Sequence, residues 1–312
     1  ENNFDPLGYI ITLGKVFNIK IHAWLNTYLI WSALTPPLNE NHLYFTNPDW
    51  FEVDFNGKSD RNIKLDKNNF NGWEGMYLSP NHPEVNLYLL DIFKELIIKY
   101  PELNGIHLDY IRFQDKYFGY NKEGINLFKS IYNFDPRDIN RGLFSTKFGW
   151  SKTKSDSISS IWSNFNCNNI SNLVKSLNNF IQINNHEILI SAAVKVNPIE
   201  ARDRWSQNWV NWLENNIMDF VVVMNYTENN NIFITNLLNI KENVISFNPS
   251  RIIIGISLYN QNEESVAEKL LLSKLSGFNM ISLFPYESIK KEEILINDIV
   301  SNYIYKKRFI GD

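Results

Sequence analysis

The sequence predicts an α/β fold of the (β/α)-barrel type, and three observations lead to this prediction. Helical and strand patterns alternate along the 312 residues, which is typical of a parallel sheet with right-handed crossovers. The strand patterns are short and mostly apolar, as in sheets that are buried on both faces. Polar or aromatic residues end each strand, and the carboxyl ends of the strands form the active site in barrels. Six strand patterns occur where a full barrel needs eight, so the predicted barrel is incomplete.

The first elements are a helix and a strand. Asp5 and Pro6 predict a helix start, because Asp caps the first N–H groups and Pro fits the first turn. The helix runs to about residue 17, with its apolar face formed by Leu7, Ile10, Ile11, Leu13 and Val16. Residues 19–26 alternate at first between apolar and polar side chains, which predicts a strand.

Residues 27–80 have no strong periodicity. The Asn56-Gly57 pair favours a tight turn, so we expect a small hairpin between residues 51–55 and 63–65. A loop of this length in a compact domain is usually functional. The prediction is therefore a lid or a cleft wall, with a surface insertion as an equally weighted alternative.

The remaining chain alternates regularly. Pro83 predicts the start of the second helix and Pro101 its end. The near-continuous apolar run at residues 188–194 is typical of a strand in a parallel sheet. The predicted elements are a helix at 83–100, a strand at 105–113, mixed loop and short helix at 114–165, a helix at 169–183, a strand at 188–194, a helix at 205–214, a strand at 219–226, a helix at 232–239, a strand at 251–259, a helix at 264–275, a strand at 280–287 and a helical tail at 291–305. No shift in composition divides the chain, so residues 1–312 are predicted to form one domain.

Composition excludes several functional classes. The net charge of -4 and the absence of a basic run give no reason to expect nucleic acid as a partner. No glycine-rich phosphate loop follows a strand, and the five scattered His lack metal-ligand spacing, so neither a cofactor nor a metal is predicted. No window reaches the about 18 apolar residues of a membrane span. Nine Trp among 14% aromatic residues favour a carbohydrate ligand, because aromatic faces stack on sugar rings.

The segment from Gly105 to Phe113 is the predicted chemical centre. His107 and Asp109 share one face of the predicted strand. Burying the carboxylate of Asp109 costs several kcal/mol unless it has partners, and His107 and Arg112 are close enough in sequence to serve. The alternative is a strand-end Asp109 that only caps the following loop.

With these motifs in view, the chain resembles the bacterial glycosyl hydrolase-like 10 family. The matching stretches occur in the family's order at residues 5–7, 22–26, 78–85, 105–113, 209–213, 219–227 and 283–287. The resemblance implies a TIM-type (β/α)8 barrel that acts on a polysaccharide, namely bacterial cell-wall glycan, and an exported or envelope location. Family members have two more strands before the Asp-Pro-Leu helix. We therefore expect strands three to eight here, with the export signal in the missing segment.

Glycoside hydrolysis ordinarily uses two carboxyl groups. Asp109 is the first candidate, and its Gly-x-His-x-Asp setting is similar to the nucleophile-bearing strand of the α-amylase superfamily. The preferred second carboxylate is Glu228, then Glu287, with Glu200 and Asp203 as further candidates. The predicted substrate-binding residues are Trp24 and Tyr226 for stacking, Asn26 and Asn225 for hydrogen bonds to sugar hydroxyls, Arg112 for a carboxylate, Lys195 and Glu287 at the cleft, and His107 with a hydrogen-bonding role.

The predicted function is glycoside hydrolysis of a bacterial polysaccharide, with peptidoglycan glycan strands as the substrate. The alternative is a catalytically inactive barrel that binds glycan, because the sequence does not identify the second carboxylate. A third possibility, polysaccharide deacetylation, requires His and Asp at metal-binding spacing, which the sequence lacks. The sequence makes no prediction of the oligomeric state.

Overall fold

The fold is mixed α/β, with six parallel strands in the order β1-β4-β5-β6-β7-β8. Their bounds are β1 (His22–Asn26), β4 (Gly105–Asp109), β5 (Leu189–Lys195), β6 (Phe220–Met224), β7 (Ile252–Ser257) and β8 (Ile281–Phe284). All six predicted strands are therefore present and follow one another in chain order, which is the order expected of an incomplete TIM-like barrel. Their numbering as strands three to eight stays a prediction.

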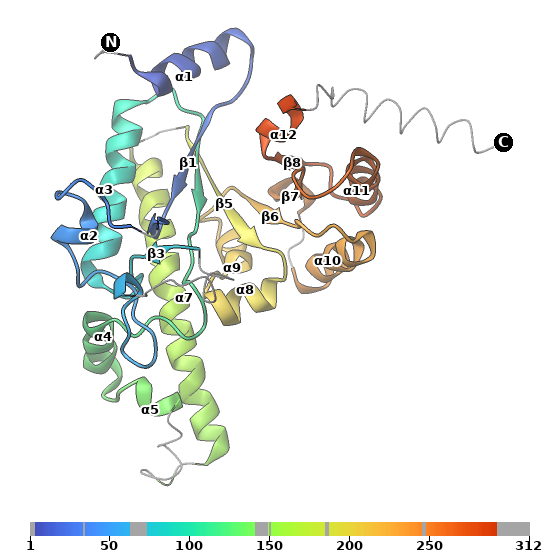
Figure 1. Cartoon of the computed structure of the whole chain (residues 1–312). Coiled ribbons are helices and arrows are strands. Elements are labelled where there is room, and N and C mark those ends of the chain that lie inside the picture. The colour runs from blue at the N-terminus through green and yellow to red at the C-terminus, as the bar shows by residue number, and fades with distance from the viewer. Residues whose placement is uncertain are drawn as a thin grey trace. The chain divides into compact units, whose positions relative to one another are not determined.

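The computed structural model describes residues 4–33, 35–62, 74–140, 149, 151–184, 187–244 and 248–291. The chain, drawn in Figure 1, folds into two compact units. The first unit contains Glu1–Ile190 and Arg202–Asn208, and the second contains Ser191–Ala201 and Trp209–Asp312. The boundary passes through β5 and through the helix that follows it.

In the first unit, β1 and β4 are parallel neighbours whose register pairs His22 with Gly105 and Asn26 with Asp109. β2 (Leu29–Trp31) and β3 (Met76–Tyr77) form a separate antiparallel pair. The helical elements are α1 (Pro6–Val16), α2 (Leu43–Thr46), the 3-10 turn η1 (Asp60–Asn62), α3 (Pro83–Lys99), α4 (Lys122–Tyr132), α5 (Arg137–Asn140) and α7 (Lys152–Ile183).

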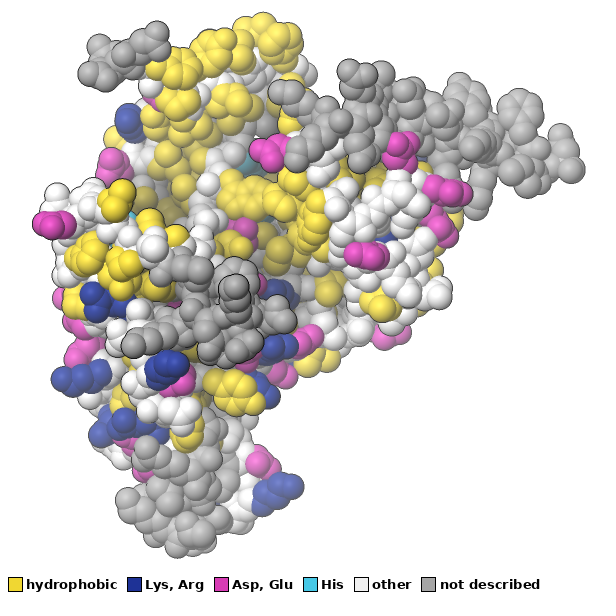
Figure 2. Space-filling view, in the orientation of Figure 1, with side chains coloured by type: hydrophobic (Ala, Val, Ile, Leu, Met, Phe, Trp, Pro, Cys, Tyr) yellow, Lys and Arg dark blue, Asp and Glu magenta, His cyan; other side chains and the backbone are white. Residues whose placement is uncertain are grey.

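The predicted start of α1 is confirmed, because the Asp5 carboxylate accepts a hydrogen bond from the Gly8 amide at 3.0 Å and Pro6 follows it. Its predicted apolar face is only partly covered. Ile11 is buried, whereas Val16 keeps 71% of its surface exposed. Figure 2 shows hydrophobic side chains gathered over this helix.

Helix α7 is much longer than the helix predicted at residues 169–183. It begins at Lys152 and contains the Ser-rich run at residues 155–160, which lies in the stretch predicted as mixed loop and short helix. In this run, Ser157 Oγ donates to the Thr153 carbonyl at 2.9 Å and Ser160 Oγ to the Asp156 carbonyl at 3.1 Å. Burial explains the extension, because Trp162 and Phe165 pack on Phe128 of α4 in an aromatic cluster. Tertiary packing has overridden a weak local preference.

The inner face of α7 also holds the single cysteine of the chain. Cys167 is buried, and its thiol donates to the carbonyl of Arg202 at 3.8 Å. Burial raises the pKa of the Cys167 thiol to about 11. The thiolate, which is the reactive form, is therefore disfavoured in the folded protein.

The hairpin predicted around Asn56-Gly57 exists, but its second arm differs from the prediction. Gly57 has φ of 84° and closes the turn by donating to the Asp54 carbonyl at 2.9 Å. The returning arm begins at once, with Val53 bridged to Ser59. Residues 63–65, the predicted arm, lie outside the described residues.

This hairpin buries two carboxyl groups, Glu52 and Asp60, both with no exposed surface. Glu52 Oε2 accepts the Gly119 amide at 2.8 Å, and Asp60 Oδ2 accepts the Tyr77 amide at 2.7 Å. The two groups thereby connect the hairpin to β3 and to the segment after β4. Burial raises the pKa of Glu52 well above its usual value, and the charge of Asp60 adds to this effect.

We expect Glu52→Gln to stabilise the protein at neutral pH. A carboxyl group with a raised folded-state pKa keeps its proton after the unfolded chain has lost it, so unfolding becomes easier as pH rises above the ordinary carboxyl pKa. The neutral amide does not titrate, so we expect the free energy of unfolding at pH 7 to rise by about 1–3 kcal/mol. Urea unfolding at pH 7 and pH 4 measures it, with Glu95→Gln on the exposed side of α3 as the control. An equal change at both pH values would contradict the interpretation.

In the second unit, β5 to β8 are parallel neighbours in chain order. The helices are α8 (Pro198–Trp205, shared with the first unit), α9 (Trp209–Glu214), α10 (Asn230–Asn243), the 3-10 turn η2 (Pro249–Arg251), α11 (Glu263–Leu275) and α12 (Tyr286–Lys291). The helix predicted at 205–214 is present as α9 but was predicted to begin too early, and α8 before it was not predicted. Ser206 has φ of 53°, a left-handed conformation that ends α8 before α9 begins. The predicted tail beyond Lys291 lies outside the described residues.

Candidate functional site

The adjacent strands β1 and β4 bring four predicted site residues together in the first unit. The register places Trp24 beside His107 and Asn26 beside Asp109. The Thr27 amide donates to the Asp109 carbonyl at 2.8 Å, which continues the ladder one residue beyond β1. Trp24 keeps 50% of its surface exposed and Asn26 is exposed too, so both are open to solvent at this edge.

Asp109 is the last residue of β4, and its carboxyl group is mostly buried. Its Oδ1 accepts the Tyr110 amide at 2.7 Å, and the Trp24 side chain also hydrogen-bonds it. Burial raises the pKa of Asp109, and the charge of Glu74 acts in the same direction. The Tyr110 amide, Arg112 and Trp24 oppose this rise. A carboxyl group whose pKa is raised by burial keeps its proton to a higher pH than an exposed one, as a general acid requires.

The chain leaves β4 through a strained residue. Tyr110 has φ of 50°, in the left-handed region that a bulky aromatic residue rarely adopts. The predicted strand to residue 113 is therefore too long, because the chain turns directly after Asp109. The Arg112 amide donates to the Tyr110 carbonyl at 2.9 Å and closes this turn. Such strained residues cluster at functional sites.

The turn places Arg112 inside the protein, with 3% of its surface exposed. Its Nη2 forms an ion pair with Glu74, and its Nη1 donates to the Phe113 carbonyl at 3.1 Å. The guanidinium also lies 5.3 Å from the ring centre of Tyr110 and 5.6 Å from that of Tyr77. Arg112 is thus held on several sides. Its predicted role of binding a substrate carboxylate stays a prediction.

Glu74 is a member of this cluster that the sequence analysis did not identify. It follows the residues 63–73 that the structure does not describe, and its Oε2 accepts the Tyr77 hydroxyl at 2.6 Å. Its side chain is 37% exposed, so it lies between the buried guanidinium and solvent. No periodicity marks this position, and Arg112 is 38 residues away in the chain. The sequence therefore contained no signal for the contact.

His107 lies one step deeper than Asp109 on β4. Burial lowers the pKa of His107 to about 4, and the nearby His22 contributes to the lowering. The ring is therefore neutral at physiological pH. It meets the Trp24 indole edge to face, with ring centres 5.2 Å apart. This contact fits a supporting role beneath the exposed indole.

The other predicted site residues belong to the second unit. Lys195 ends β5, and its carbonyl accepts the Trp209 indole N–H at 3.2 Å. Asn225 follows β6 and is buried, with its amide donating to the Phe233 carbonyl at 3.1 Å. Tyr226 stacks on Phe284 with ring centres 5.9 Å apart. Two exposed carboxylates complete this set, Glu228 in the loop after β6 and Glu287 in α12.

A buried lysine holds the loop that contains Glu228. Lys269 of α11 has no exposed surface, and its ammonium donates to the Glu228 carbonyl at 3.0 Å. It also donates to Gln261 and, at 3.3 Å, to the Ser265 hydroxyl. Three acceptors match three N–H groups, so this charge is satisfied within the protein. The loops after β6 and β7 are thereby tied together.

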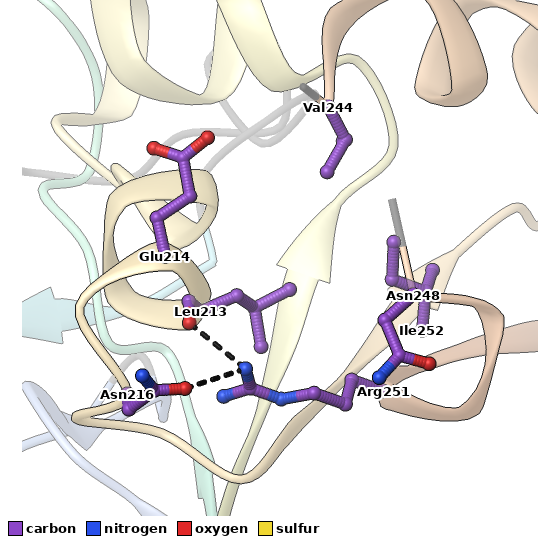
Figure 3. A pocket seen from close by; sticks show the side chains of 7 residues that line it. All are labelled: Leu213, Glu214, Asn216, Val244, Asn248, Arg251 and Ile252. Atoms are coloured by element: carbon purple, nitrogen blue, oxygen red, sulfur yellow. Dashed lines mark hydrogen bonds between the residues drawn. The ribbon is translucent and has the colours of Figure 1, made fainter. Parts of the chain in front are cut away.

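A pocket of about 210 Å³ lies elsewhere in the second unit, beside the amino end of β7 (Figure 3). Arg251 lines this pocket, and its guanidinium donates to the Leu213 carbonyl and to Asn216 Oδ1 at 2.9 Å each. The Asp219 and Met218 carbonyls accept from the same guanidinium. The arginine therefore closes the end of α9, and we interpret the pocket as a structural gap away from the carboxyl ends of the strands.

We expect Arg251→Met to destabilise the protein by about 2–3 kcal/mol, because several carbonyls lose a charged donor at once. Thermal unfolding followed by circular dichroism measures the effect. Lys274→Met, at an exposed position in the last turn of α11, is the matched control. A loss no larger than that of the control would contradict the assignment.

Within the described part of the chain, no group of three or more His, Cys, Asp or Glu side chains could hold a metal ion. Helices long and apolar enough to cross a membrane are also absent from that part.

Comparison with known proteins agrees with the motif resemblance. The family model described as Glycosyl hydrolase-like 10 matches residues 1–272. No curated protein matches the chain. The matched range contains Asp109 and Glu228 and ends before Glu287.

Proposed function

Because the chain belongs to the glycosyl hydrolase-like 10 family, we propose that it is a glycoside hydrolase that cleaves a bacterial polysaccharide. The proposed substrate is the glycan strand of peptidoglycan, and the proposed location is the cell envelope or the exterior of the cell. The observation that supports the proposal best is Asp109, a mostly buried carboxyl group at a strand end beside the half-exposed indole of Trp24. A sugar ring stacked on that indole would bring its glycosidic bond close to the carboxyl group.

The proposed chemistry is hydrolysis with acid and base catalysis by two carboxyl groups. Asp109 gives its proton to the glycosidic oxygen as the bond to the anomeric carbon breaks. Water supplies a hydroxyl group to that carbon, and its proton goes to the second carboxylate. We propose Glu228 for this second role. Its backbone is fixed by the buried ammonium of Lys269, and its side chain is exposed.

The remaining residues predicted for the site are proposed to bind the glycan. The amides of Asn26 and Asn225 are proposed to hydrogen-bond sugar hydroxyls, and Tyr226 is proposed to add a second stacking face. Asn225 already bonds Phe233 and Asn236, so it would contribute a preorganised group. Lys195 and Glu287 are proposed to contact polar groups of the glycan.

The second candidate function is a glycan-binding barrel without catalysis. One observation favours it: near Asp109 in the first unit, the further acid Glu74 is bound by Arg112 and by the Tyr77 hydroxyl. A carboxylate held in this way is poorly suited to exchange a proton with water. Binding would then depend on the exposed Trp24 indole and on amide groups.

Release of new reducing ends from peptidoglycan glycan strands tests the two functions against each other. Strands stripped of peptides and intact strands are incubated with the protein and with its Asp109→Asn form. We expect cleavage by the protein and its loss in the variant. Cosedimentation with the strands but no cleavage would support the binding barrel instead. Cleavage by both forms would contradict the assignment of Asp109.

A further inference from the structure

We propose that Glu74 is a positioning residue for Asp109, which it controls by fixing the buried guanidinium of Arg112 beside the turn that follows Asp109. This inference deepens the proposed function and rests on it. The site needs a carboxyl group that can hold a proton, and an unfixed arginine two positions beyond Tyr110 would compete for that carboxyl group.

The first step of the argument is the burial of Arg112. A guanidinium with 3% of its surface exposed requires a nearby anion, because an unpaired buried charge is strongly destabilising. Glu74 provides this anion, and the same carboxylate oxygen accepts the Tyr77 hydroxyl at 2.6 Å. Glu74 is thereby oriented from two sides, and it fixes where the guanidinium lies.

The second step is the short path from Arg112 to Asp109. The guanidinium lies 5.3 Å from the ring centre of Tyr110, and the Arg112 amide donates to the Tyr110 carbonyl. The Tyr110 amide in turn donates to the Asp109 carboxylate at 2.7 Å. One strained residue therefore connects the ion pair to the carboxyl group, and its conformation depends on where Arg112 is held.

The third step is the set of charges around Asp109. The neighbouring strand β1 contributes Trp24 and Asn26, which do not titrate. The titratable groups are His107 of β4, Tyr110 and Arg112 of the following turn, and Glu74 and Tyr77 of the segment that includes β3. His107 is neutral at physiological pH, as described above. Among the residues that the structure describes, Arg112 and Glu74 therefore act on Asp109 with opposite charges.

The ion pair thus has two separable effects. Glu74 keeps the guanidinium occupied, so that Arg112 does not turn to Asp109 and hold it ionised. Arg112 in return supplies a positive charge that keeps the pKa of Asp109 from rising further. Removing either member breaks the same contact. Loss of Glu74 leaves the positive charge of Arg112 beside Asp109, and loss of Arg112 leaves the negative charge of Glu74.

Titration of the Asp109 carboxyl carbon by NMR in Glu74→Gln and Arg112→Met tests the proposal. We expect the midpoint to move down in Glu74→Gln, because a negative charge is lost and Arg112 is released. We expect it to move up in Arg112→Met, because a positive charge is lost and Glu74 is released. Where cleavage is measured, the limb of the pH–rate profile that reports Asp109 should move in the same two directions.

A merely structural ion pair predicts a different result, because both variants break the same contact. Midpoints that move in one direction, or that do not move, would overturn the proposal. Glu74→Asp and Arg112→Lys keep the charges and should restore most of the midpoint. If the buried Arg112→Met variant fails to fold, the downward shift expected in Glu74→Gln, at a side chain that is 37% exposed, still tests the proposal. Glu102→Gln is the matched control, because it breaks the surface ion pair with Lys15 in the same unit. The titration needs no substrate, so it stands even if the protein cleaves no glycan.

Discussion

Asp109→Asn is expected to lower kcat for glycan cleavage by about a thousandfold, which lies within the range measured for general acid–base groups. Asn keeps the shape of the side chain and can still accept the Tyr110 amide, but it cannot deliver a proton. KM should change little, since the exposed Trp24 indole and Asn26 amide stay in place. Initial rates of reducing-end release over a range of glycan concentrations measure both constants.

The leaving group reveals which role Asp109 has in the reaction. A general acid is needed most when the leaving oxygen is a poor leaving group, so an activated aryl glycoside should lose far less activity in Asp109→Asn than the natural glycan does. An equal loss on both substrates would instead favour the nucleophile that the α-amylase-like strand pattern implies. Glu242→Gln, at an exposed position in α10, is the control for a carboxylate outside the proposed site. An unchanged rate in Asp109→Asn would exclude both roles.

Gly105→Ala is expected to destabilise the protein by about 2–3 kcal/mol, at the upper end of the cost of overpacking. Gly105 is the buried first residue of β4, directly opposite His22 of β1. A Cβ atom there would lie 2.1 Å from Nδ1 and 2.8 Å from Cγ of the His22 ring. The ring must swing away as a whole, and the pairing that places Asp109 beside Asn26 would be disturbed with it. Urea unfolding measures the loss.

A second substitution tests whether the imidazole is the cause. His22→Ala removes the ring, so Gly105→Ala should cost much less in that background than in the original protein. The difference between the two costs is the coupling free energy of the pair. A cost that is equal in both backgrounds would mean that the strand backbone, and not the ring, limits this position.

The sequence predicted the strands better than the helices, for a physical reason. Each strand was predicted from a short run of mostly apolar or alternating residues, and all six runs form strands. Four of them were predicted to run past their observed ends, because polar residues such as Arg112 leave the ladder early. Helix α7 was predicted too short, since the Ser-rich run has a weak helical preference and the burial of Trp162 is a tertiary effect.

Only the part of the candidate site that lies on the strands could be predicted from the sequence. Asp109 and His107 share β4, and Trp24 lies on the adjacent strand, so a periodic pattern could identify them. Glu74 and Glu52 acquire their roles from partners distant in the chain, and no local pattern encodes such contacts. Both come from the stretch without periodicity at residues 27–80, for which the sequence predicted a lid or a cleft wall and no buried charges.

The thiol of Cys167 makes unfolding directly observable without an engineered probe. The chain has one cysteine, and in the folded protein it is buried with its pKa near 11, so alkylating reagents should modify it only when α7 opens. Mass spectrometry would then follow a single mass increment per chain. At high reagent concentration the rate of alkylation equals the rate at which α7 opens. At low concentration the rate of alkylation reports the opening equilibrium, as in hydrogen exchange.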